Sequence, residues 1–141
     1  MFIGEYHHTI DDKGRLAVPA KFRAQLKSGA VITRGLDSCL FLYTKDEWAN
    51  LAAKLINLPI SQAKSRAFAR LMLAGAHEAE TDSQGRINVP DHLISYAKLT
   101  KKAVVAGLYN RIEIWDSGKW SRYKSQAEKA REKIAESLEG L

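Results

Sequence analysis

The 141-residue sequence contains one cysteine, three prolines and no long run of apolar residues. A single cysteine, Cys39, cannot form an intrachain disulfide or a cysteine-based metal cage, which favours a reducing compartment. The apolar stretch at residues 71–76 falls far short of the ~20 residues that a membrane-spanning helix needs. The first residues also lack the basic segment and apolar core of a signal peptide. We therefore expect a soluble, cytoplasmic protein without a membrane partner.

Motifs of common enzyme classes are also missing. No Gly-x-Gly-x-x-Gly or Walker-type loop is present. His7 and His8 are adjacent, so on a strand they would point to opposite faces and could not ligate one metal together. His77 and His92 are isolated, and Cys39 lies at the start of an apolar strand, where a small core residue is the simpler interpretation. We expect no catalytic residue, no metal site and no cofactor.

Basic residues outnumber acidic ones, and the excess lies mainly in the first half. The chain has 22 Lys and Arg against 16 Asp and Glu, a formal net charge of +6. Residues 1–71 hold 11 basic and 6 acidic residues, whereas residues 72–141 hold 11 and 10. A basic globular composition favours a polyanionic partner without identifying it. We expect the first half to carry most of the positive surface.

The sequence contains an internal repeat. The pattern Asp-x-x-Gly-Arg-[Leu/Ile]-x-Val-Pro occupies residues 11–19 and returns at residues 82–90, an offset of 71. Later correspondences include Trp48 and Trp120, at an offset of 72. A repeat of this length indicates a duplicated structural unit.

We therefore divide the chain into two halves. The first half, residues 1–71, would hold a module at residues 1–45 followed by helices. The second half, residues 72–141, would hold a module at residues 76–117 followed by a C-terminal helix. The pattern of short apolar runs and turn residues predicts two hairpins with a short helix between them in each module, an α+β fold. The predicted hairpins pair residues 3–10 with 15–18 and 30–34 with 39–43, and in the second half residues 76–81 with 86–89 and 103–107 with 111–115.

Helix signals follow the first module. Thr44 and Glu47 form a Thr-x-x-Glu capping box, which predicts a helix beginning near residue 45. Pro59 should end that helix, and Ser61 can cap another that stops at Gly75. This second helix would also join the two halves.

A striped helix is predicted at the C-terminus, because apolar residues recur there at steps of three and four. They are Trp120, Tyr123, Ala127, Ala130, Ile134 and Leu138. The stripe fits a helix packed on one side, which we favour, and it also fits a contact between subunits.

Aspartate and glycine in the repeated motif predict a tight turn. Asp11 and Asp82 can accept hydrogen bonds from backbone N–H groups two or three residues later and so hold the turn. Gly14 and Gly85 can adopt positive φ without a Cβ penalty and let a partner approach the backbone closely.

The arginines that follow each turn have two interpretations. Arg15 and Arg86 present planar forks of donors that suit phosphates or guanine. They could instead pair with the carboxylates of their own turns. Lys13 lies inside the first turn, and Lys21 and Arg23 follow its strand. The second turn has the neutral pair of residues 83 and 84 at its centre. We expect the first turn to be the stronger anion site.

These residues together resemble the MraZ family of bacterial transcriptional regulators, which are built from two tandem AbrB-type swapped-hairpin modules. The resemblance covers almost the whole chain. It rests on residues 1–6, 11–23, 33–37, 82–90 and 110–115.

The resemblance implies that the two modules interlock into one pseudo-two-fold β-barrel with flanking helices, and that the chain assembles into a ring-shaped homo-oligomer. It implies a repressor on the nucleoid that binds short direct repeats in double-stranded DNA upstream of the division and cell-wall gene cluster, which includes its own gene. DNA contacts would fall on the two turns, at Arg15, Arg86 and Lys13 with Gly14 and Gly85. Lys21 is an additional candidate contact.

Two further points follow from the resemblance. It implies an interaction with the small-subunit rRNA methyltransferase encoded nearby. Glu80 stands where the family pattern has a cysteine, which concerns local packing or charge near the second turn. A competing interpretation is an AbrB-type antitoxin, but those chains typically have one module and a disordered tail, whereas this chain has two modules and an ordered final helix.

Overall fold

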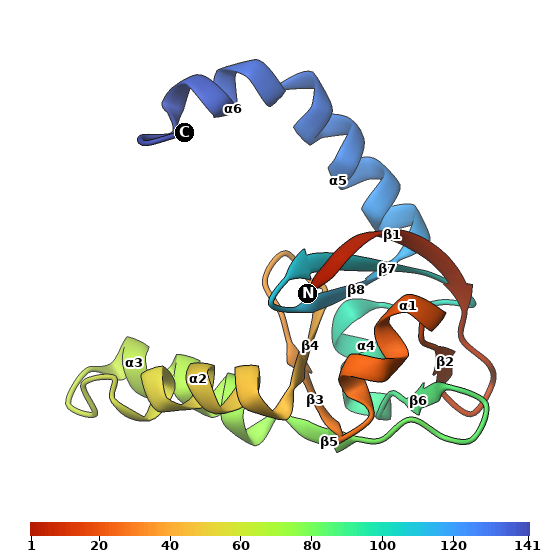
Figure 1. Ribbon diagram of the computed structural model, residues 1–141. Helices are drawn as coiled ribbons and strands as arrows, with labels where there is room; N and C mark the ends of the chain where they lie inside the picture. Colours follow the sequence, from red (N-terminus) through yellow and green to blue (C-terminus); the bar gives the residue numbers. More distant parts are fainter.

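The computed structural model describes residues 1–141 and is a mixed α+β fold (Figure 1). Six strands form an antiparallel sheet in the order β1-β7-β8-β4-β3-β5, and β2 and β6 form a separate ladder. The strands are β1 (Phe2–Thr9), β2 (Arg15–Ala17), β3 (Ala30–Arg34), β4 (Leu40–Thr44), β5 (His77–Ala79), β6 (Arg86–Asn88), β7 (Lys102–Tyr109) and β8 (Ile112–Asp116).

The two halves of the chain interlock through these strands. β1 of the first half pairs with β7 of the second, and β5 of the second half pairs with β3 of the first. β4 pairs with β8 and β2 with β6, so both of these ladders also join the halves. Because β1, β2, β3 and β4 correspond to β5, β6, β7 and β8 in the repeat, the pairing has pseudo-two-fold symmetry.

The predicted first hairpin of each half is wrong. β2 does not form a ladder with β1 but pairs with β6, with Leu16 opposite Ile87, and only a single bridge links Ile10 to Leu16. β6 likewise forms no ladder with β5, which pairs with β3. The two copies of the motif carry nearly the same residues, so the sequence pattern is satisfied equally well by pairing within a half or between halves.

The implied barrel is not closed by hydrogen bonds. β1 and β5 are the two edges of the six-stranded sheet, and β2 and β6 stand apart from it. The predicted second hairpins are confirmed, since β3 pairs with β4 and β7 pairs with β8.

Alternating side chains bury both faces of the sheet. In β4, Leu40 and Leu42 belong to a core of 20 buried residues, whereas Phe41 and Tyr43 belong to a second core of eight. The larger core draws on both halves of the chain: Leu16 of β2 and Ile87 of β6 lie in it together with Phe22 of α1 and Leu93 of α4. The smaller core also combines residues of both halves, so the interlocked halves share both cores.

Helices cover the sheet and extend from it. They are α1 (Ala20–Arg23), α2 (Lys45–Ile56), α3 (Ala63–Ala69), α4 (Asp91–Ala97), α5 (Ser117–Lys129) and α6 (Arg131–Ser137), with a 3-10 turn η1 (Ala24–Leu26) and a π turn η2 (Arg70–Ala74). The side chain of Thr44 caps α2 by accepting from the N–H of Glu47. Ser61 does not cap α3, whose N-cap is Gln62, and the helical segment stops at Gly75 as predicted. None of these helices has both the length and the apolar character needed to cross a membrane.

The C-terminal stripe is packed only at its beginning. The ring centroids of Trp120 and Tyr123 lie 5.4 Å and 5.0 Å from that of Trp115. Trp120 and Lys124 also bind the carboxylate of Glu5 on β1, which fixes α5 to the sheet. Every residue from 131 onward is exposed, and α6 projects away from the body (Figure 1). The predicted helix is present as α5 and α6, but only the first part of its stripe packs on the body of the chain.

Candidate nucleic-acid interface

Each repeated motif forms a tight turn held by its aspartate. Oδ1 of Asp11 accepts hydrogen bonds from the backbone N–H groups of Lys13 and Arg15, both at 2.9 Å. The Asp82 side chain makes the equivalent bonds to the second turn, two and four residues on, at the same distances. The predicted role of both aspartates is confirmed, except that the second donor lies four residues away rather than three.

The glycines of the turns have the predicted left-handed conformation, with φ of +77° at Gly14 and +74° at Gly85. Each glycine carbonyl accepts a hydrogen bond from the other half of the chain. Val18 N–H donates to Gly85 O at 2.9 Å, and Val89 N–H donates to Gly14 O at 2.8 Å. Each turn is therefore held by the strand end that belongs to the opposite copy of the motif.

The arginines pair with the aspartates of their own turns. Nε of Arg15 lies 2.6 Å from Oδ2 of Asp11, and Nε of Arg86 lies 2.9 Å from Oδ2 of Asp82. Nη1 of Arg86 also lies 3.8 Å from Oδ2 of Asp11, which links the two turns. The Nη atoms of Arg15 have no hydrogen bond to the protein. The pairing thus orients each guanidinium through Nε and leaves most of its fork for another acceptor.

Both aspartates are held in the charged form. The backbone N–H of the arginine four residues later is the largest cause that lowers the pKa of Asp11 and of Asp82, and the arginine side chain lowers it further. A charged carboxylate accepts both the backbone and the guanidinium donors, so each turn is organised across the neutral pH range.

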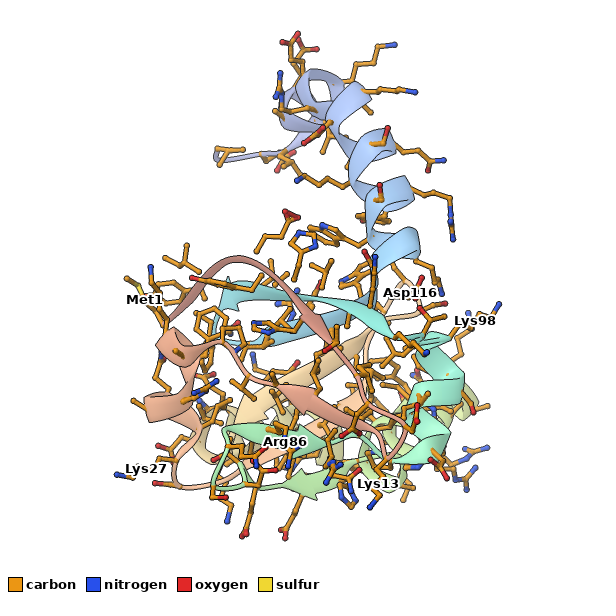
Figure 2. All side chains as sticks on the ribbon, turned by 90° about the vertical axis from the view of Figure 1, so that its right-hand side faces the viewer. Met1, Lys13, Lys27, Arg86, Lys98 and Asp116 are labelled. Atoms are coloured by element: carbon orange, nitrogen blue, oxygen red, sulfur yellow. The ribbon has the colours of Figure 1, made fainter.

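The two turns lie on the same side of the molecule. In Figure 1 both project to the right, opposite the arm formed by α2 and α3. Figure 2 shows Lys13 and Arg86 at the end of the body away from α5 and α6. Lys13 and Lys21 are exposed, whereas Arg15 and Arg86 are half-buried. The two turns are thus presented on one side of the molecule, and Lys21 is exposed on α1.

Arg23, on the same short helix as Lys21, lies beside the second turn. Its Nε donates to Val18 O at 2.9 Å, and Val18 N–H is bound to Gly85 O. A methyl group added at Gly85 would lie only 2.6 Å from Cζ of Arg23. A linear sequence comparison misses this contact because Arg23 is 62 positions away from Gly85.

The equivalent position beside the first turn is apolar. At the repeat offset of 71, Ile94 corresponds to Arg23, and its Cδ1 would lie 3.2 Å from a methyl group at Gly14. An open hollow next to the first turn is lined by Asp11, Asp12 and Asp91 together with Lys101. Each turn is therefore flanked by a residue of the opposite half, which is a cation at the second turn and an apolar residue at the first.

Other residues singled out in the sequence lie outside the two turns. Cys39 is fully buried, burial raises the pKa of its thiol, and its Sγ contacts Leu36 O at 3.1 Å. Glu80 is exposed, so the departure from the family pattern alters surface charge and not core packing. No group of three or more His, Cys, Asp or Glu side chains converges as metal ligands would.

The sequence matches a known family over both halves. The profile of the family described as "MraZ protein, putative antitoxin-like" matches residues 1–71 and again residues 72–140.

Curated relatives match along the full chain. A protein of Desulforamulus reducens and one of Halothermothrix orenii are each 50% identical over 141 residues, which is 100% of this chain and 99% of theirs. A protein of Ligilactobacillus salivarius is 51% identical over 138 residues, 98% of this chain and 96% of its own. All three carry the name "Transcriptional regulator MraZ".

Proposed function

This chain belongs to the MraZ family, and on that premise we propose that it represses transcription by binding double-stranded DNA through its two Asp-x-x-Gly-Arg turns. Membership makes it a transcription regulator and not an enzyme. In the proposal, Arg15 and Arg86 are the principal contacts and Lys13 and Lys21 add charge. Gly14 and Gly85 let the DNA approach the backbone, while the two aspartates hold the turns.

One observation carries the proposal: both turns present an arginine oriented through Nε on the same side of the molecule. A guanidinium fixed in this way loses less rotamer entropy when it binds a phosphate or a base edge. Since both arginines are charged and only half-buried, their free N–H groups are accessible. Two such turns in fixed relative positions can contact neighbouring phosphates of one duplex.

The proposed target is a set of short direct repeats upstream of the division and cell-wall gene cluster, including this chain's own promoter. One pair of turns makes few contacts and would bind weakly, whereas linked copies on repeated sites gain avidity. We therefore propose a ring-shaped homo-oligomer. Exposed apolar side chains on three parts of the surface support assembly: Ile3 and Leu108 on β1 and β7, Ile56 and Ile60 on the arm, and Ile134 and Leu138 on or beside α6.

The remaining parts of the proposal rest on the family resemblance alone. They are a cytoplasmic location on the nucleoid and an interaction with the small-subunit rRNA methyltransferase encoded nearby. No residue described above is assigned to that second interaction.

A gel-shift titration with the DNA upstream of the protein's own gene tests the proposal. We expect a shift that weakens as salt rises, because phosphate contacts release counterions. The control is the same DNA with the direct repeats scrambled, which should bind more weakly, and a DNA with a single repeat should lose the avidity gain. Absence of any salt-sensitive shift at physiological ionic strength would contradict DNA binding and favour a protein-binding role.

A further inference from the structure

We propose that Arg23 completes a phosphate-binding site at the second turn, so that this site is composed of residues from both halves of the chain. The inference rests on the DNA-binding function proposed above and assigns it a further contact. The ligand is a DNA phosphate, held between the guanidinium of Arg23 and the turn that carries Gly85 and Arg86.

The position of Arg23 is set by the interlocked backbone. Val18 offers its N–H to Gly85 O and its carbonyl to Nε of Arg23, both at 2.9 Å. One residue at the end of β2 therefore holds the second turn and the guanidinium together. A Cβ at position 85 would lie 2.6 Å from Cζ of Arg23, so the guanidinium packs directly against the turn.

The outer end of Arg23 is available for a ligand. Its only hydrogen bond to the protein is the one from Nε, and no carboxylate pairs with it. The residue is exposed. The charge of Arg23 acts on its surroundings, because burial and then the nearby Arg23 lower the pKa of His8. An unpaired guanidinium with a fixed Nε presents its two Nη groups as a planar donor pair, which suits a phosphate.

The first turn has no equivalent. Ile94 occupies the corresponding place, and the hollow beside that turn is lined by three aspartates and by Lys101. Lys13 supplies the charge of the first turn, and Arg23 supplies that of the second. Both belong to residues 1–71, so interlocking distributes the basic excess of the first half over both turns. The second turn therefore has a cationic neighbour although the residues at its own centre are neutral.

The test is the affinity of full-length protein for one direct-repeat DNA, measured over a range of salt concentrations. The variants are Arg23→Ala, Arg23→Lys and, as a matched loss of one positive charge far from the turns, Lys133→Ala. The slope of log K against log salt is negative, and loss of one phosphate contact reduces its magnitude by about 0.9. For each turn engaged, this corresponds to about a fivefold loss in affinity at 0.15 M salt relative to 1 M salt. We expect this change in Arg23→Ala and not in Lys133→Ala.

Arg23→Lys separates charge from geometry. It should keep the salt slope, because a cation remains, and bind more weakly than the wild type, because the Nε bond to Val18 O and the planar donor pair are lost. Thermal melts of each variant identify a purely structural role, which would lower the melting temperature and leave the slope unchanged.

The outcomes separate this inference from the proposed function. If the wild type shows no salt-dependent binding, the proposed function fails. If the wild type binds and folded Arg23→Ala matches Lys133→Ala in both affinity and slope, the assignment of Arg23 is overturned while DNA binding by the turns stands.

Discussion

At the residue scale, the two motif glycines have the same backbone conformation and different surroundings. A methyl group at Gly14 would lie 2.7 Å from the backbone oxygen of Val89, a residue whose N–H donates to Gly14 O from the opposite half. At Gly85 it would meet the side chain of Arg23, which can move. Equal sequence positions in a repeat thus have unequal tolerance to substitution.

This difference predicts unequal losses of stability. Gly14→Ala and Gly85→Ala both force a non-glycine residue into positive φ, at a cost of about 1 to 2 kcal/mol. Gly14→Ala must also displace backbone, so its free energy of unfolding should fall by about 1 kcal/mol more. Urea unfolding of the two variants is the measurement, and equal losses would contradict the described contacts.

The turn aspartates predict a pH dependence. Their pKa values are lowered in the folded state, so their contribution to stability is present above the unfolded-state pKa of about 3.9 and is lost as pH falls through the lower folded-state pKa. Asp82→Asn removes this contribution, so the variant should be less stable than the wild type at neutral pH and approach it in strong acid.

Thermal melts over a pH series measure that difference. Asp46→Asn is the control, because Asp46 lies exposed in the first turn of α2 and is no part of the motif. A gap between wild type and Asp82→Asn that stays constant into strong acid would contradict the role of the carboxylate.

At the scale of elements, most features that depend on adjacent residues could be predicted from the sequence, whereas the pairing of β2 with a distant strand could not. The capping box at Thr44, the glycine stop at Gly75 and the positive φ of the motif glycines depend on a few adjacent residues, and the structure confirms them. The partner of β2 depends on which of two nearly identical motifs lies beside it. Arg23 was missed as a neighbour of Gly85 for the same reason, since the contact exists only after the halves interlock.

The C-terminal helix illustrates a second limit. Periodicity identified the stripe from Trp120 onward, but it indicates only which residues share a face and not how far the body extends beneath them. The body ends near Tyr123, and residues from 131 onward contact solvent.

Truncation after residue 130 should therefore leave the fold intact. No side chain of α6 is buried, so the free energy of unfolding should change by less than about 0.5 kcal/mol. Urea unfolding measures this, and Trp120→Ala is the contrasting variant, because it removes a side chain packed on Trp115 and bound to Glu5. A large loss on truncation would show that α6 contacts the body or another subunit.

At the scale of the whole molecule, the two cores each combine residues of both halves, which predicts a single unfolding transition. Leu16 and Ile87 face each other across the ladder that joins the halves, and each is 1% exposed. Leu16→Ala and Ile87→Ala should each lower the free energy of unfolding by about 2 to 5 kcal/mol and shift the midpoint of the same transition. Two separate transitions, each sensitive to one variant, would indicate independent halves.

Assembly is the second expectation at this scale. Light scattering at micromolar concentration should give a mass several times the 15.8 kDa of one chain, since the proposed binding to repeated sites gains its strength from linked copies. A monomer at that concentration would contradict the ring.

The central claim is that the two turns bind DNA, and the affinity of an Arg15→Ala/Arg86→Ala variant for a direct-repeat DNA tests it most directly. Each forked contact is worth about 1 to 3 kcal/mol, so the account predicts a loss of about 30-fold or more, increased by avidity. Arg122→Ala/Arg131→Ala removes equal charge from α5 and α6 and should lose far less. A motif variant that stays folded and keeps its oligomeric mass, yet binds as tightly as the wild type, would contradict the account.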